Sequence, residues 1–245
     1  MAVIKTLSLL LLLAVGALGA PHKAEQPATL EARQGGNPYW YKYWANDQAV
    51  VESENRAAGV FTVGWNEPNG GNFVIGKGYR TGFNTRFNYS GTFTPGRNSN
   101  TYLALYGWTY GPTSEYYVME SFGVHHPADN PNSTCYGHFT SDGGTYEIWD
   151  KYNGQIHQLW SVRTTRRVGG TITTGNHFRA FEAVGLRLGR HGEMIIGIEG
   201  QWGSGNATIT AGVPPATRVV ESATPTTRTQ VPIRTGTCTA SININ

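Results

Sequence analysis

Two neighbouring stretches, Tyr102–Trp108 and Glu115–Phe122, constrain the fold of this chain more than any other feature. In each stretch alternate residues are alike, and successive side chains in a β-strand point to opposite faces. The segment between them contains Gly111-Pro112, which is a turn signal. The pair therefore predicts two strands joined by a turn.

The two faces of this strand pair differ in chemistry. One face would carry four apolar or aromatic residues, namely Leu103, Leu105, Tyr116 and Val118. The other face would carry Tyr102, Ala104, Tyr106 and Trp108 together with Glu115, Tyr117 and Met119. The second set combines aromatic rings, hydroxyl groups and one acid, which is the composition of a sugar-binding cleft. These two strands alone do not show which residue lies across the cleft from Glu115.

The overall composition favours a secreted all-β protein. Of the 245 residues, 39% are hydrophobic, 12% are aromatic and only 14% are charged, with 32 glycines. This length allows one large β domain with tails. The net charge is only +3 and no block of Lys or Arg occurs, so nucleic-acid binding has no electrostatic support.

The N-terminal region is typical of a segment removed during secretion. Residues 1–19 read as a signal peptide, with Lys5 as the charge and Leu7–Val15 as a short apolar core. That core is too short to span a bilayer, so we expect no membrane partner. Residues 20–33 are polar and end at Arg33, as in a propeptide cleaved after a basic residue. Both segments are excluded from the predicted fold, and the protein is expected to be extracellular.

Residues 34–212 form the predicted domain, in which short strands alternate with Gly, Asn, Pro and Asp turns. The remaining predicted strands are Tyr39–Trp44, Val60–Trp65, Asn72–Gly78, Phe87–Phe93, Thr145–Trp149, His157–Thr164, Met194–Glu199 and Ala207–Ala211. This many strands at this spacing predict a two-sheet sandwich or jelly roll. Only Asn176–Leu188 has apolar residues at helical spacing, which predicts one helix packed on a sheet.

Residues 213–245 are interpreted as a tail, because residues 213–237 are rich in Pro, Thr, Arg and Val without strand alternation. The two cysteines, Cys135 and Cys238, would enter an oxidising compartment, but one pair in a sequence does not prove a bridge. Three N-x-S/T sequons fit secretion: Asn88, Asn132 and Asn206.

Two acids sit in unusual settings. Glu115 lies among tyrosines, and Glu199 follows an aliphatic strand with glycines on both sides. Partial burial would raise the pKa of such a carboxyl, as a general acid requires. Pattern alone does not select this pair, because other glutamates are equally suitable by residue type: Glu52, Glu54, Glu147, Glu182 and Glu193.

A family resemblance does select it. Seven motifs occur in order: NPYWYKYW, GGNFVIGKG, YLALYGWT, SEYYVMESFG, TSDGGTYEIW, LWSVRTTRRVGGTITTGNHF and GIEGQWGSGNATIT. From about Asn37 to Ala211 the chain resembles a fungal endo-1,4-β-xylanase of glycoside hydrolase family 11. The resemblance implies an all-β jelly roll of two strongly twisted antiparallel sheets around a long cleft, with one helix. It also implies a monomer that acts on xylan without cofactor or metal.

The resemblance gives roles to individual residues. Glu115 resembles the nucleophile and Glu199 the acid/base of a retaining mechanism, in which two carboxyls lie roughly 5–5.5 Å apart. Residues that resemble substrate-binding positions are Trp44, Asn72, Tyr102, Tyr106, Tyr117, Lys151 and Gln158. Asn72 falls where the family places the neighbour of the acid/base, and an Asn there implies a pH optimum closer to neutral than to acidic.

The chain departs from the family pattern above the cleft. The family has a long hairpin, the thumb, before the WSVR motif, but only DKYNGQIHQ separates Trp149 from Leu159 here. Lys151 replaces an arginine and lacks its planar fork. Glu193 stands where the family often has a substrate-binding tyrosine. Two hypotheses follow: a working xylanase with a more open cleft, or a xylan-binding or elicitor-like protein with little turnover.

Overall fold

The computed structural model describes residues 39–67, 70–126, 132–212 and 238–244. The predicted signal peptide and propeptide, and residues 213–237 of the predicted tail, lie outside these ranges. Within them, no helix is long and apolar enough to cross a membrane.

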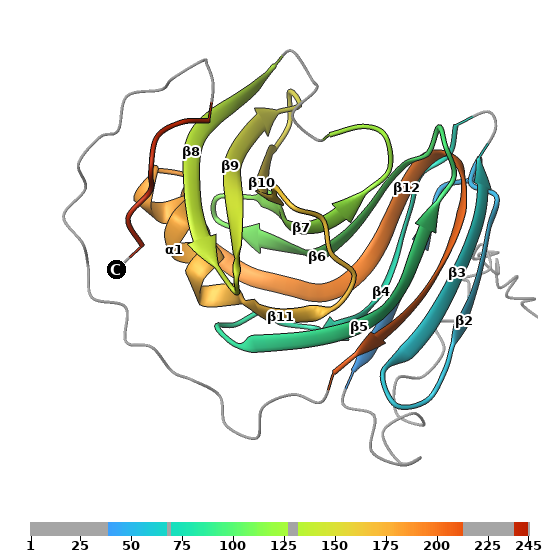
Figure 1. Cartoon of the computed structure of the whole chain (residues 1–245). Coiled ribbons are helices and arrows are strands. Elements are labelled where there is room, and N and C mark those ends of the chain that lie inside the picture. The colour runs from blue at the N-terminus through green and yellow to red at the C-terminus, as the bar shows by residue number, and fades with distance from the viewer. Residues whose placement is uncertain (1–38, 68–69, 127–131, 213–237, 245) are drawn as a thin grey trace, which may run out of the picture.

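The described chain forms twelve strands and one helix (Figure 1). The strands are β1 Trp40–Ala45, β2 Val51–Asn55, β3 Val60–Glu67, β4 Phe73–Tyr79, β5 Arg86–Pro95, β6 Asn100–Tyr110, β7 Ser114–Phe122, β8 Ser133–Ser141, β9 Gly144–Tyr152, β10 His157–Arg163, β11 Gly170–Thr173 and β12 Arg190–Ala211. All of the predicted strands are present. Three strands were not predicted: β2, β8 and β11.

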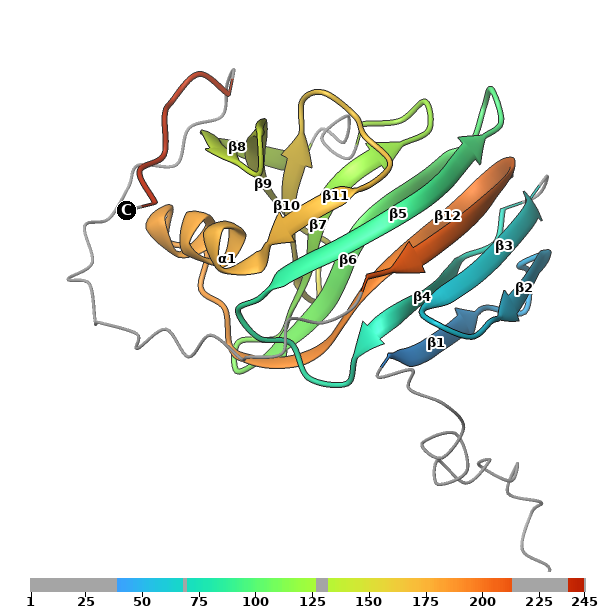
Figure 2. The same ribbon diagram turned by 60° about the horizontal axis from the view of Figure 1, so that its bottom comes forward.

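Strand β12 connects two sheets. Its first part pairs with β4 and β6 in a sheet ordered β1-β4-β12-β6-β7-β10-β9-β8, here called the cleft sheet. Its second part pairs with β3 and β5 in an outer sheet that also holds β2 and β11, and Figure 2 shows β5, β12 and β3 side by side. The two strands predicted at Met194–Glu199 and Ala207–Ala211 are therefore one strand of 22 residues. Among the twelve strands described, every pairing is antiparallel except that of β7 with β10.

The hydrophobic core lies between the two sheets. Leu103, Leu105, Tyr116 and Val118 all belong to it, as their predicted face requires. The outer sheet supplies side chains such as Trp65, which is 4% exposed. These observations confirm the predicted jelly roll of two sheets with one helix.

The helix is shorter than predicted. It spans Thr174–Ala183 and not Asn176–Leu188. Gly185 has a φ of 85°, in the left-handed region that favours glycine, and this residue ends the helical path. Leu186 is nevertheless buried, because the chain after the helix turns back onto the core.

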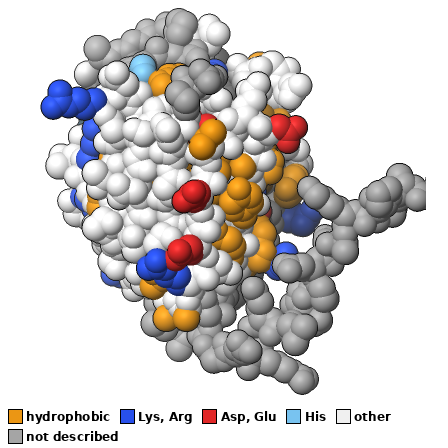
Figure 3. All heavy atoms as spheres, turned by 90° about the vertical axis from the view of Figure 1, so that its right-hand side faces the viewer, with side chains coloured by type: hydrophobic (Ala, Val, Ile, Leu, Met, Phe, Trp, Pro, Cys, Tyr) orange, Lys and Arg blue, Asp and Glu red, His pale blue; other side chains and the backbone are white. Residues whose placement is uncertain are grey.

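The free edge of the outer sheet carries charge. In β2 the side chains of Glu52 and Glu54 are exposed, and Glu54 pairs with Arg56 at 2.6 Å. Figure 3 shows acidic side chains on this face of the molecule, beside a band of hydrophobic ones. Charges on an edge strand discourage pairing with another chain.

The end of the chain returns to the free edge of the cleft sheet at β8. Cys238 forms a disulfide with Cys135, and Ser241 bridges to His138 (Figure 1). Ile242 and Ile244 pack against the core, and Arg179 of α1 donates to the carbonyl of Ile244 at 3.1 Å. We call Cys238–Ile244 the C-terminal strap. The bridge that the sequence left open is therefore present.

Candidate active site

The concave face of the cleft sheet carries the second face of the β6–β7 pair. Ala104, Tyr106, Tyr117 and Met119 form an apolar cluster there that is separate from the main core. Because β7 has apolar or aromatic neighbours on both faces, all nine of its residues are buried. Glu115 therefore stands on a rigid inner strand.

Most of the predicted site residues fall into two rows across the cleft sheet. In the first row Glu115 lies opposite Gln158 of β10, and Gln158 lies opposite Lys151 of β9. In the second row Glu199 lies opposite Tyr102 of β6 and opposite Val74, which pairs in turn with Trp44. Partners in a β-ladder share a face, so each row presents its side chains to the cleft.

Glu115 is held by two hydrogen bonds. Tyr106 donates its hydroxyl to Oε1 at 2.8 Å, and Gln158 donates its amide to Oε2 at 2.8 Å. The Trp108 indole donates in turn to the Tyr106 hydroxyl at 2.6 Å. Each carboxyl oxygen thus accepts from one donor, which fixes the orientation of Glu115. The side chain is largely buried, since Glu115 is 8% exposed.

Glu199 has a different environment. Burial, together with the negative charge of Glu115, raises its pKa to about 8. Hydrogen bonds from Tyr117 and Asn72 and the charge of Lys42 act in the opposite direction. Its Oε2 atom is buried and has no hydrogen-bond partner among the described residues. This carboxyl is therefore suited to hold a proton at neutral pH.

Two tyrosines connect the acids. The negative charges of both Glu115 and Glu199 act on Tyr106 and on Tyr117, where burial is the largest cause of a raised pKa. Strand β6 pairs with β12 on one side and with β7 on the other. Glu199 of β12 lies opposite Tyr102, and Glu115 of β7 lies opposite Trp108, so their partners are six residues apart along β6. The twist and curvature of the sheet close this offset, so the carboxyls of the two rows reach one site.

The acids open into a hollow of roughly 460 Å³. Besides Glu115, Glu199, Asn72 and Gln158, its lining includes Asn46, Gln48, Gln201 and Trp202, which the sequence analysis did not select. Gln201 could have been found from its spacing, because it lies two residues after Glu199 on the same strand. Trp202 is 41% exposed and contacts the ring of His125 edge-on at 5.2 Å.

Other predicted residues lie along the same face. Trp44 is 47% exposed, which leaves its ring free to stack on a sugar. Asn72 accompanies Glu199, and its amide also donates to the Gly200 carbonyl at 3.4 Å. Lys151 is partly buried beside Gln158. The structure thus brings the predicted residues to one concave face.

The connection between β9 and β10 is a tight turn over residues 153–156. The Asn153 side-chain oxygen accepts from the backbone N–H groups of Gln155 and Ile156, both at 3.0 Å. Below the turn, His157 Nδ1 contacts the Asp150 carboxylate at 2.9 Å. These contacts hold the turn together close to the ends of its two strands.

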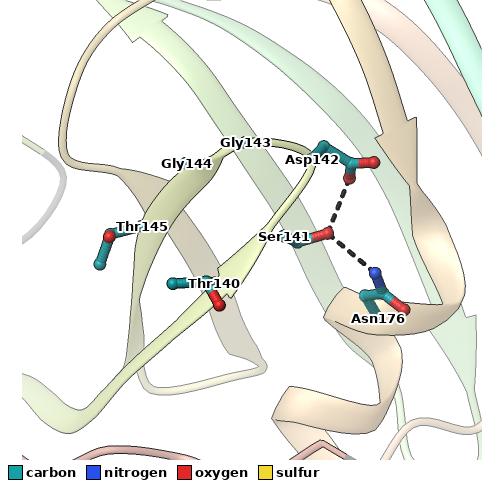
Figure 4. Close-up of a pocket in the computed structure, with 7 residues that line it drawn as sticks. All are labelled: Thr140, Ser141, Asp142, Gly143, Gly144, Thr145 and Asn176. Carbon is teal, nitrogen blue, oxygen red and sulfur yellow. Dashed lines mark hydrogen bonds between the residues drawn. The ribbon is translucent and has the colours of Figure 1, made fainter.

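A second hollow lies at the opposite side of the fold, where the β8–β9 turn meets the start of α1 (Figure 4). Ser141 lies between Asp142, to which it donates at 2.7 Å, and Asn176, from which it accepts at 2.9 Å. Although burial disfavours the charged form, hydrogen bonds from Thr173 and Ser141 hold the pKa of Asp142 below its usual value. The Asn176–Ser141 hydrogen bond joins the turn to the helix, and the Thr173–Asp142 bonds join it to the residue before the helix.

Close to this hollow, Ser161 and His177 are hydrogen-bonded at 2.8 Å, and His177 Nε2 lies 4.0 Å from Asp142. The residue types match a nucleophilic triad, but Ser161 and His177 are both 0% exposed. Burial lowers the pKa of His177 to about 3, so the imidazole stays neutral. We assign this group to the core. Among the described residues, no cluster of His, Cys, Asp or Glu is arranged to hold a metal ion.

Comparison with known proteins identifies the family. The model of glycosyl hydrolases family 11 matches residues 36–210. This chain belongs to glycosyl hydrolases family 11. The family 11 domain therefore contains both acid rows and every predicted site residue.

Relatives agree with this family 11 assignment. "Endo-1,4-beta-xylanase B" of Penicillium oxalicum is 40% identical over 212 residues, covering 80% of this chain and 66% of that protein. "Ethylene-inducing xylanase" of Penicillium digitatum is 39% identical over 207 residues, covering 80% and 93%. A solved endo-1,4-beta-xylanase structure of Trichoderma reesei superposes with a TM-score of 0.63 at 34% identity, covering 71% of this chain and 98% of that one.

Proposed function

We propose that the protein is a secreted endo-1,4-β-xylanase that cleaves internal bonds of xylan with retention of anomeric configuration. The observation that carries the proposal is the pair of carboxyls in unequal environments. Glu115 is oriented by two donors, whereas Glu199 is partly buried beside that negative charge, with its Oε2 atom enclosed, and keeps its proton. Unequal titration of two carboxyls is what glycoside hydrolysis requires.

In the first step Glu199 donates its proton to the oxygen of the glycosidic bond. The carboxylate of Glu115 attacks the anomeric carbon as the bond to that oxygen breaks, and a covalent glycosyl-enzyme forms. The hydrogen bonds from Tyr106 and Gln158 keep the attacking oxygen in place before the reaction.

In the second step Glu199 acts as a base. Once Glu115 is esterified its negative charge is gone, and one cause of the raised pKa of Glu199 disappears with it. The Glu199 carboxylate then takes a proton from water, whose oxygen attacks the anomeric carbon and releases Glu115. The same charge coupling therefore supports both halves of the cycle.

Xylan is the substrate that the relatives indicate, since those quoted above are named as xylanases. Trp44 is exposed in the row of Glu199 and would stack on an apolar sugar face. Only residues 153–156 connect β9 to β10, so we expect a cleft that is open above Glu115, with substrate held mainly by its floor and walls.

Reducing-sugar release from xylan tests the proposal. Wild type is compared with Glu115→Gln and with Glu52→Gln, a control at an exposed acid on β2. We expect Glu115→Gln to lose roughly a hundredfold or more of the rate, and Glu52→Gln to retain it. Anomer-resolved NMR of the first product should show the β form.

Two results would overturn the proposal. If wild type and Glu115→Gln both bind xylan and neither releases sugar, the chain is a binding or elicitor-like protein. If sugar is released first as the α anomer, the reaction inverts, and Glu115 is not the nucleophile.

A further inference from the structure

Lys42 crosses the part of the cleft floor that has no side chains. It lies on β1 opposite Gly76 of β4, and Gly76 lies opposite Gly197 of β12. The lysine side chain extends over these glycines toward β6, where its ammonium lies 5.5 Å from the centre of the Tyr106 ring. A residue on the edge strand thus brings a positive charge into the middle of the site.

Glu193 holds this lysine. The Lys42 ammonium and the Glu193 carboxylate form an ion pair that joins β1 to the start of β12. Glu193 lies where the pairing of β12 with β6 shifts between His191 and Met194, and a bulge of this kind re-aims side chains. The two side chains are only 17% and 18% exposed, so this pair is not an ordinary surface salt bridge.

The pair is connected to both catalytic acids. Lys42 lies over the ring of Tyr106, and the Tyr106 hydroxyl donates to Glu115. The positive charge of Lys42 also acts on Glu199, where it favours the carboxylate form. Lys42 is therefore the cation that opposes the proton-retaining environment of Glu199.

The charged and titratable groups that face Glu199 come from four strands. They are Glu115 and Tyr117 on β7, Tyr106 on β6, Lys42 on β1 and, through its pair with Lys42, Glu193 on β12 itself. On β9, Lys151 lies beyond Gln158 and Glu115 in the other row. On β4, Lys77 is fully buried and donates to the Arg56 carbonyl, away from the cleft.

We propose that Lys42 and Glu193 form a positioning pair for the xylanase reaction: Lys42 supplies a positive charge beside the two carboxyls, and Glu193 limits how strongly that charge acts on Glu199. This inference rests on the proposed function. It gives Glu193 an electrostatic role toward Glu199.

The sign of each substitution follows from the charges. Without Lys42, the lone Glu193 carboxylate and the missing cation both favour the protonated form of Glu199. Without the Glu193 carboxylate, Lys42 is no longer neutralised and favours the ionised form of Glu199 more strongly. Removing both charges returns the balance close to that of wild type.

The test is the pH dependence of kcat/KM on soluble xylan above neutral pH, where loss of the Glu199 proton ends activity. We expect Lys42→Met to displace this alkaline limb upward by about one pH unit and Glu193→Gln to displace it downward by a similar amount. The double variant Lys42→Met/Glu193→Gln should lie near wild type. Lys42→Arg keeps the charge and should keep the wild-type limb.

The outcomes separate this inference from the proposed function. If wild type does not hydrolyse xylan, the proposed function is wrong, and the inference falls with it. If wild type is active but the two single variants shift the limb in the same direction, or not at all, the positioning pair alone is wrong. A fall in rate without opposite shifts would show a merely structural role for the pair.

Discussion

Two glutamates on this scaffold, the partly buried Glu199 in the cleft and the fully buried Glu120 behind it, differ in the charges that surround them. Glu120 is 0% exposed and accepts from the hydroxyls of Tyr89 and Tyr146 at 2.7 and 2.6 Å. It also forms an ion pair with Arg167. Glu199 likewise has a tyrosine and an amide as donors, but Lys42, the cation that acts on it, is already paired with Glu193.

The difference shows how one fold makes a structural acid and a chemical one. A buried carboxyl that pairs with a guanidinium and accepts from two hydroxyls has every oxygen satisfied by a fixed partner. A buried carboxyl beside another negative charge retains its proton and can donate it. The number of surrounding tyrosines does not decide between these outcomes; the partner charge does.

The largest expected effect comes from removing the structural acid. Glu120→Gln leaves Arg167 with an uncompensated positive charge in a largely buried position, and we expect a loss of about 3–5 kcal/mol in the free energy of unfolding. Urea denaturation at neutral pH measures this loss. The matched variant is Glu199→Gln, which replaces a protonated carboxyl with a neutral amide and should unfold close to wild type.

The distinction between a structural and a chemical acid is wrong if Glu120→Gln unfolds like wild type and Glu199→Gln is strongly destabilised. A stable Glu120→Gln protein would mean that the Arg167 pair contributes no net stability. A strongly destabilised Glu199→Gln protein would mean that Glu199 is an anion with a structural role. Activity separates them further, because Glu199→Gln should lose about a hundredfold or more and Glu120→Gln, while folded, should retain turnover.

The next effect concerns the C-terminal strap, which like Glu120 has a structural role. The Cys135–Cys238 disulfide closes a separation of 103 residues. We expect Cys238→Ser to lower the free energy of unfolding by about 2–4 kcal/mol, because the unfolded chain gains freedom and the strap can leave β8. Measurements of kcat on the folded variant should match wild type. A reduced kcat at unchanged stability would show instead that the strap shapes the cleft.

The smallest effect concerns the proton on Glu199 itself. Since its pKa is raised to about 8, the acid is protonated below that pH and loses its proton above it. Activity should therefore persist at neutral pH and fall about tenfold per unit once the pH exceeds roughly 8. A pH–rate profile of wild type measures this. A maximum below about pH 4, near ordinary carboxyl pKa values, would contradict both this argument and the expectation from Asn72.

Local patterns predicted the elements that alternate strongly. The faces of β6 and β7 follow from the order of Leu103, Tyr106, Glu115 and Tyr116, because β-strands have a period of two. Weaker elements were missed. Strand β8 does bury alternate residues, including Cys135 and Phe139, but glycine and polar residues between them hide the pattern. Strands β2 and β11 each contain a single apolar residue, so neither shows an alternating pattern.

The amino-acid sequence by itself determined the two-faced β6–β7 pair, the strand-rich class and, through its motifs, Glu115 and Glu199. Only the tertiary structure decided which charges meet. The tertiary structure brings Glu115 and Glu199 together although their partners on β6 are six residues apart. It also pairs Arg167 with Glu120 and places Lys42 between Tyr106 and Glu193. The physical reason is sequence separation. A strand pattern depends on residues that are neighbours in the chain, whereas a pKa depends on charges from distant parts of the chain that the twisted sheet brings together.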